Sequence, residues 1–229
     1  MGTVPVLAQT RHELRWGWEG ALTGAGSVLH GFSLWKKEQN RTLALPPLEL
    51  GTVPPLDRVS TRQWSVQAHR TSNVLFGVAT AASLATAIIN QHGERSLVPV
   101  VVILESGFLS AGLTNTVKEL VHRPRPYLYN PDLPASAYQP GEDAVSFWSG
   151  HTANMAAITF STASMVQHSE ASPGLKTATW IGAATVPAAM GYLRVRAGRH
   201  FPTDVLTGYL VGAAVGFAVP YFHSPRPEP

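Results

Sequence analysis

Three short groups of polar residues in this chain have the side-chain types that phosphate chemistry uses. In chain order they are Lys118 with Arg125; Ser149, Gly150 and His151; and Arg194 with His200 and Asp204. Two guanidinium groups and one ammonium match the charge and geometry of a phosphate. A single Lys or Arg beside an apolar segment is often only a side chain that reaches the lipid headgroups. Three cations together with two histidines and an aspartate instead predict a phosphate-binding active site.

The two histidines divide the expected chemistry between them. His200 and Asp204 are four residues apart, so on a helix that begins near residue 200 they share one face, and the carboxylate fixes the tautomer of the imidazole. His200 is then the nucleophile that attacks phosphorus, while His151 protonates the leaving alkoxide and afterwards activates water. A metal site built from the same residues fits less well because the surrounding cations would repel a metal ion. We therefore predict no metal and no cofactor.

The remaining residues of the three groups are expected to hold the phosphate. Ser149 and Gly150 open a helix, whose outward-pointing backbone N–H groups and dipole favour an anion, and Gly150 allows the backbone to approach it closely. His122 and Arg123 flank the first group and are predicted to support it. Glu105 is expected to pair with a basic neighbour inside the helix bundle, and the other histidines are assigned surface or packing roles.

Apolar stretches of the chain must position these groups. Five of them are predicted to span a membrane: 74–89, 97–117, 151–166, 175–193 and 205–222. A sixth, residues 16–35, fits either a first span or a helix lying in the membrane interface, because tryptophans stand at both ends but Glu19 and His30 interrupt it. If the spans alternate in direction, four of their ends lie on the same side of the membrane: the end of the third, the start of the fourth, the end of the fifth and the start of the sixth. These four points carry the three polar groups.

The rest of the chain is assigned to connections. Residues 36–70 are predicted to form a polar loop with a short surface helix around residues 56–69, to which no function is assigned. Residues 123–147 are predicted to form a Pro-rich loop. We divide the chain into an N-terminal region, residues 1–70, and a core, residues 71–229.

The composition fits an all-α integral membrane bundle. Only 14% of the 229 residues are charged, and the mean hydropathy is +0.04. Glycines recur every four residues in the last apolar stretch, which predicts close helix packing (Gly208, Gly212 and Gly216). The net charge of +3 comes without a Lys/Arg-rich run, so anionic lipid is a better partner than nucleic acid. The absence of cysteine excludes disulfides and thiol catalysis.

The three polar groups resemble the motifs of the type 2 phosphatidic acid phosphatase (PAP2) superfamily, whose pattern is K-x6-RP, then PSGH, then SR-x5-H-x3-D. Here the chain has KELVHRPRP from Lys118, SGH from Ser149, and RVRAGRHFPTD from Arg194. The resemblance implies a bundle of six, and at least five, transmembrane helices with a PAP2/haloperoxidase-like core. It also implies a metal-independent phosphatase that works through a phosphohistidine.

The same resemblance implies a role for each matching residue. By position, His200 corresponds to the nucleophile, Asp204 to its orienting partner and His151 to the general acid. The implied phosphate ligands are Lys118, Arg125, Ser149, Gly150 and Arg194. Two positions depart from the family pattern: Trp148 replaces the Pro before SGH, and Leu193 replaces the Ser before the arginine. Neither change removes a group that breaks bonds, so activity is still expected.

The leading functional prediction is a membrane phosphatase acting on a lipid phosphate, with phosphatidate, phosphatidylglycerol phosphate, undecaprenyl pyrophosphate and a lipid A phosphate as candidates. The alternatives are a soluble acid phosphatase, a vanadium haloperoxidase-like enzyme, and a non-catalytic membrane protein that binds anionic lipid. The basic residues of segment 36–70 would place the site in the cytoplasm by the positive-inside rule. The resemblance instead implies a bacterial inner membrane with the site on the extracytoplasmic face, which we adopt as the expectation. The sequence does not predict an oligomeric state.

Overall fold

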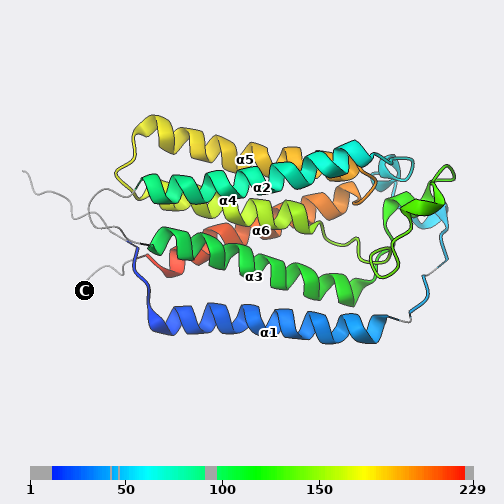
Figure 1. Ribbon diagram of the computed structural model, residues 1–229, viewed down its shortest axis with the longest axis horizontal. Coiled ribbons are helices and arrows are strands. Elements are labelled where there is room, and N and C mark those ends of the chain that lie inside the picture. The colour runs from blue at the N-terminus through cyan, green and yellow to red at the C-terminus, as the bar shows by residue number, and fades with distance from the viewer. Residues whose placement is uncertain (1–11, 42, 46, 91–96, 225–229) are drawn as a thin grey trace, which may run out of the picture.

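The computed structural model describes residues 12–41, 43–45, 47–90 and 97–224. In this part of the chain six α-helices run along the long axis of the molecule (Figure 1). They are α1 (Trp16–Asn40), α2 (Val66–Ile89), α3 (Val98–Val121), α4 (Gly150–Gln167), α5 (Pro173–Arg196) and α6 (Pro202–Phe222). Four short 3-10 turns, η1 (Leu50–Thr52), η2 (Asp57–Ser60), η3 (Pro126–Tyr129) and η4 (Ala135–Ala137), lie in the connections. No strand occurs among the described residues, and the all-α prediction is confirmed.

Each predicted apolar stretch lies within one helix, and local signals set the helix ends. Proline stands in the first turn of α3, α5 and α6, where its missing N–H costs nothing. The Ser65 side chain caps α2 by accepting from the backbone N–H of Ala68 at 3.1 Å. The predicted surface helix over residues 56–69 is therefore wrong: the segment contains η2 and then the first turn of α2. Helix α3 ends at Val121, and the next residue, His122, caps it with a left-handed φ of 51°.

Helix α4 forms the centre of the bundle. Twelve of its 18 residues are buried, and it packs against α6, α5, α3 and α2, whereas α1 lies on the outside against α3. A Cβ atom at Gly212 would lie 2.0 Å from the carbonyl oxygen of Ala153, and one at Gly208 would lie 2.7 Å from that of Ser149. The glycines of α6 thus face the backbone of α4, which confirms the close packing predicted from their spacing.

Three of the described helices, α2, α3 and α6, are long and apolar enough to cross a membrane. Large apolar side chains such as Val74, Val78, Leu206 and Leu210 are exposed on α2 and α6, as lipid contact requires. Helix α4 is not apolar enough to count among them because it is rich in small polar residues. Most of these side chains are buried within the bundle, and Ser161, for example, accepts a hydrogen bond from Ser106 of α3. Membrane crossing by α1, α4 and α5 stays a prediction.

The topology brings the polar groups together. The end of α3, the start of α4, the end of α5 and the start of α6 lie at one end of the bundle, beside the loops that carry η2, η3 and η4 (Figure 1). The start of α1 and the end of α6 lie at the opposite end. The bundle therefore has two chemically distinct ends, and all three sequence motifs are at the first.

Candidate active site

His200 lies in the short connection between α5 and α6 and is 1% exposed. Its Nδ1 is 2.8 Å from the backbone carbonyl oxygen of Ser146. A carbonyl can only accept, so Nδ1 carries the proton, and the neutral ring keeps a lone pair on Nε2. That Nε2 atom is 3.5 Å from Nη1 of Arg125. Burial and then the charges of Arg125, Arg194 and Lys118 hold the pKa of His200 well below its usual value. The imidazole is therefore neutral and nucleophilic.

Asp204 is fully buried in the first turn of α6 and organises the residues around His200. Its carboxylate accepts from Ser146 Oγ and Arg123 Nη1, both at 2.5 Å, and from the backbone N–H of Phe201 at 2.8 Å. Its Oδ2 is 3.6 Å from His200 Nδ1, which is too long for a hydrogen bond. The direct orienting contact expected between Asp204 and His200 is thus made by the carbonyl of Ser146, and Asp204 holds that residue in place.

Arg125 reaches the site from the loop after α3 and is 4% exposed. Its Nη1 donates to the carbonyl of Arg199 at 2.9 Å, and its Nε donates to the carbonyl of Glu142 at 2.6 Å. Its Nη2 donates to the Glu142 carboxylate at 3.1 Å. Burial raises the pKa of Glu142, but Arg125, Lys118 and Lys37 together lower it further, and the net result is a pKa below the usual value. An ionised carboxylate therefore lies against an arginine that was predicted to bind phosphate.

Arg194, at the end of α5, is also 4% exposed. Its Nη1 donates to Ser72 Oγ at 3.1 Å and to His69 Nδ1 at 2.9 Å, both on α2. Its Nε is buried and has no hydrogen-bond partner among the described residues. The Lys118 ammonium lies close to the start of α4, 3.7 Å from where a Cβ atom of Gly150 would be. An unpartnered guanidinium N–H and a nearby ammonium are the donors that an anionic ligand would satisfy.

Ser149 is the N-cap of α4, and its polar groups are used differently from the sequence expectation. Its backbone N–H donates to the carbonyl of Asp204 at 3.0 Å, and its hydroxyl lies 2.9 Å from Thr152 Oγ1. The N–H of Ser149 thus joins α4 to α6 and does not point out toward a ligand. At this helix start, outward N–H groups are left to Gly150 and His151.

His151 is held from α2. Its Nε2 is 2.9 Å from Asn73 Oδ1, and its ring lies edge-on to Phe76 with centroids 5.6 Å apart. An amide oxygen only accepts, so Nε2 carries the proton in this arrangement. Sequence reasoning gave Asn73 no role, because an isolated Asn near a helix start has no recognisable pattern.

The N-terminal region contributes Asp57, which sequence reasoning also missed. Asp57 is fully buried, and its carboxylate accepts from Arg123 Nη2 at 2.7 Å, from the backbone N–H of Thr203 at 3.0 Å and from its hydroxyl at 2.6 Å. Because Arg123 also bonds Asp204, the arginine links the two carboxylates. This places Arg123 in the supporting position predicted for it, whereas Arg196 is exposed and joins none of these contacts.

The two residues that depart from the family pattern lie at the edges of the site. Trp148 Nε1 donates to Thr114 Oγ1 of α3 at 2.7 Å, which fixes the approach to α4. Leu193 is half-buried, one residue before Arg194. The hydrogen bonds of Arg194 described above do not need a Ser at position 193.

Comparison with known proteins gives one result. The family model of the PAP2 superfamily matches residues 99–228, which is more than half of the chain and includes every residue of the three motifs. Neither the curated proteins nor the solved structures yield a match. The motifs, the six-helix bundle and the buried histidine among cations agree with the family match, and the chain therefore belongs to the PAP2 superfamily.

Proposed function

We propose that this protein is a membrane phosphatase that hydrolyses a lipid phosphate monoester or pyrophosphate through a phosphohistidine on His200, without a metal. The observation that carries the proposal is the state of His200: a buried, neutral imidazole with its Nε2 lone pair directed toward Arg125. Such a ring is a nucleophile. The cations around it would bind the phosphate and stabilise charge on its oxygens in the transition state.

In the proposed reaction the phosphate is held by Lys118, Arg125, Arg194 and the start of α4. His151 takes up a second proton when the phosphate binds, because the anion beside it favours the charged ring. Nε2 of His200 attacks phosphorus, the bond from phosphorus to the lipid oxygen breaks, and Nδ1 of the His151 imidazolium gives its proton to the leaving alkoxide. Water then attacks the phosphohistidine and gives a proton to His151. The N–P bond breaks, inorganic phosphate leaves, and both histidines return to their first state.

A lipid substrate is supported by an apolar groove beside His151. The groove has a volume of about 270 Å³ and is formed by α2, α3 and α4. Phe76, whose ring touches His151, stands among its lining residues together with Leu84, Leu104, Phe108 and Ile158. A hydrocarbon chain in this groove would place its headgroup next to the general acid. The candidates remain phosphatidate, phosphatidylglycerol phosphate, undecaprenyl pyrophosphate and a lipid A phosphate.

The test is phosphate release by detergent-purified protein from a panel of these lipids, in excess EDTA and well below the melting temperature. We expect turnover that survives EDTA and is lost in His200→Ala. His168→Ala is a matched control, because His168 is exposed at the opposite end of the bundle. Turnover that EDTA abolishes, or that His200→Ala retains, would refute the phosphohistidine mechanism. Equal rates on lipids and on small soluble phosphate esters would refute the lipid specificity.

We also propose that the site faces the extracytoplasmic side of a bacterial inner membrane. Because the chain has no cysteine, one introduced thiol gives an unambiguous readout. Arg196→Cys places it at an exposed position at the site end of α5. We expect a membrane-impermeant thiol reagent to label this variant in intact cells, and labelling only after lysis would place the site in the cytoplasm.

A further inference from the structure

Three potential metal ligands from three helices meet at the end of the bundle opposite the phosphate site. Glu19 is in the first turn of α1, Glu105 lies within α3, and His223 directly follows α6. Their ligand atoms all lie within 4.8 Å of one another. His223 Nε2 is 2.8 Å from Glu19 Oε1 and 3.3 Å from Glu105 Oε2. Glu105, predicted to pair with a basic neighbour, thus faces a histidine.

The tautomer of His223 decides what this arrangement needs. Its Nδ1 is 2.8 Å from the backbone carbonyl oxygen of Val219. That oxygen only accepts, so Nδ1 carries a proton and Nε2 is the ring nitrogen that faces the two carboxylates. Carboxylate oxygens also only accept, so no hydrogen-bond donor lies among Nε2 and the two carboxylates unless Nε2 carries a second proton. The arrangement is stable only when a cation, either a metal ion or an added proton, lies among them.

Burial strengthens the need for a cation among these three side chains, because water cannot reach them to replace it. The side chains of His223, Glu105 and Glu19 are 0%, 12% and 16% exposed. Glu105 Oε2 is buried and has no hydrogen-bond partner among the described residues. The Thr23 hydroxyl donates to the other oxygen of Glu105, and the backbone N–H of Arg15 donates to Glu19 Oε1, each at 3.3 Å. These weak bonds leave two carboxylates and one imidazole nitrogen facing one another, a ligand set that suits a divalent cation.

We propose that Glu19, Glu105 and His223 bind one divalent transition-metal ion, with Zn²⁺ the best fit. One imidazole and two carboxylates are ligands that Zn²⁺ accepts, with water completing a tetrahedral set. The bond from His223 Nδ1 to the Val219 carbonyl is the outer contact that fixes a metal-binding imidazole. The ion has a structural role: it joins α1, which lies outside the family match at residues 99–228, to α3 and α6 of the family core.

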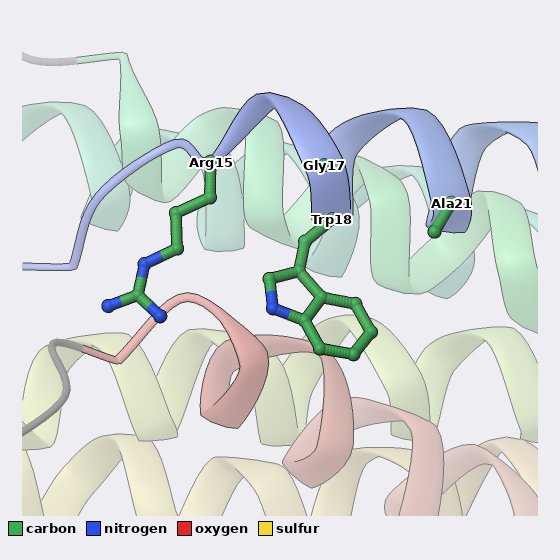
Figure 2. A pocket seen from close by; sticks show the side chains of 4 residues that line it. All are labelled: Arg15, Gly17, Trp18 and Ala21. Carbon is green, nitrogen blue, oxygen red and sulfur yellow. The ribbon is translucent and has the colours of Figure 1, made fainter.

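The surroundings support a preformed site. The rings of Trp18 and Phe222 stack with centroids 4.5 Å apart, and these are the neighbours in sequence of Glu19 and His223. The stack therefore holds the two ligand-bearing helix ends together. A pocket of about 530 Å³ lies here, lined by Arg15, Gly17, Trp18 and Ala21. Figure 2 shows Arg15 and Trp18, at the start of α1, extending toward the end of α6, so the pocket lies beside the two helix ends that the stack joins.

The first test is the metal content of the detergent-purified protein, stripped with a chelator and then equilibrated with Zn²⁺. We expect about one tightly bound ion per chain. Glu105→Gln and His223→Ala should each weaken binding by more than about tenfold, since even the loss of an outer contact has that effect. Glu38→Gln and His168→Ala are matched controls, because both residues are exposed and lie outside the cluster. They should bind Zn²⁺ as the unaltered protein does.

A second measurement separates a site from a folding defect. Zn²⁺ should raise the melting temperature of the unaltered protein and of both controls, but not that of Glu105→Gln or His223→Ala. Phosphatase activity at low temperature reports that each variant is folded, since the catalytic residues are at the other end. No bound ion, or binding that the two ligand variants share with the controls, would overturn the proposal: a proton, not a metal, would then hold the cluster. Either result leaves the proposed phosphatase activity untouched.

Discussion

Replacing Glu142 by Gln removes a carboxylate that competes with the substrate for Arg125. The Glu142 side chain is 47% exposed, and its carboxylate accepts from Arg125 Nη2 at 3.1 Å and lies 3.6 Å from Lys37 Nζ. Arg125 itself is buried and stays in place without the carboxylate, because the backbone carbonyls of Glu142 and Arg199 accept from its Nε and Nη1. The substitution therefore replaces a charged acceptor of one guanidinium N–H by a weaker neutral one, which phosphate displaces more easily, and leaves the arginine where it is.

The size of the effect follows from the exposure of Glu142. A hydrogen bond between charged groups contributes about 1.5–3 kcal/mol when buried, and an exposed ion pair contributes about 0.2–1 kcal/mol. For the half-exposed carboxylate of Glu142 against the buried guanidinium of Arg125, we take an interaction free energy of about 1 kcal/mol. Since 1.4 kcal/mol is a factor of ten, we expect Glu142→Gln to tighten phosphate binding by roughly fivefold.

The assay is inhibition of turnover by inorganic phosphate, the reaction product. The inhibition constant should fall in Glu142→Gln while kcat changes little. Glu38→Gln is the matched control: the same substitution at an exposed residue whose partner, Arg41, is also on the surface. Phosphate that binds equally or more weakly to Glu142→Gln would refute the competition, and would mean that this carboxylate positions Arg125 for binding.

The same comparison has a defined pH dependence. The pKa of Glu142 lies below its usual value because the nearby cations outweigh the effect of burial. The carboxylate is therefore charged, and competes, at every pH above that lowered pKa. The advantage of Glu142→Gln should be complete at neutral and mildly acidic pH and vanish only as the pH falls below the ordinary range of a Glu. An advantage already lost near pH 6, on the order of 2 units above the free-Glu pKa, would contradict the charge argument.

Three further outcomes follow from the structure. Gly212→Ala should lower the melting temperature, at a cost of about 1–3 kcal/mol, because a Cβ there would lie 2.0 Å from a backbone oxygen of α4; Gly24→Ala, with nothing within 4 Å, should not. Asp57→Asn should destabilise the fold by about 3 kcal/mol, since it breaks the buried pair with Arg123, and calorimetry measures this loss. Histidine ring NMR should find His200 neutral and protonated on Nδ1 at about pH 6, below the free-histidine pKa. A half-protonated ring at that pH would refute the argument that burial and the surrounding cations keep His200 neutral.

The parts of the site that the sequence predicted are those with fixed local spacing. Ser149 and Gly150 mark the start of α4 because a cap and a small residue precede an apolar run. The placement of Lys118, Arg194 and His200 followed from alternating helices, since each lies at a helix end. Such patterns are readable because neighbours in sequence create them.

The contacts that the sequence did not predict join distant parts of the chain. Asp57 meets Thr203 across 146 residues, and His69 meets Arg194 across 125. Neither Asp57 nor His69 belongs to a spacing pattern, and both lie in a segment whose prolines and polarity resemble any surface loop. The orienting group of His200 is a backbone carbonyl, at Ser146, and a carbonyl has no signature in a sequence. Only the packed bundle identifies these partners.

Each end of the bundle has a buried histidine held by a backbone carbonyl, but the charges around the two histidines are opposite. In both His200 and His223 a backbone carbonyl fixes a proton on Nδ1 and leaves Nε2 to face the neighbouring charged groups. Around His200 the neighbours are cations, which keep the ring neutral and attract an anion, so the lone pair is available to an electrophilic phosphorus. Around His223 the neighbours are the carboxylates of Glu19 and Glu105, so Nε2 completes a cluster that attracts a cation, either a proton or the proposed metal ion. The sign of the surrounding charge, and not the histidine, decides which ligand each end binds.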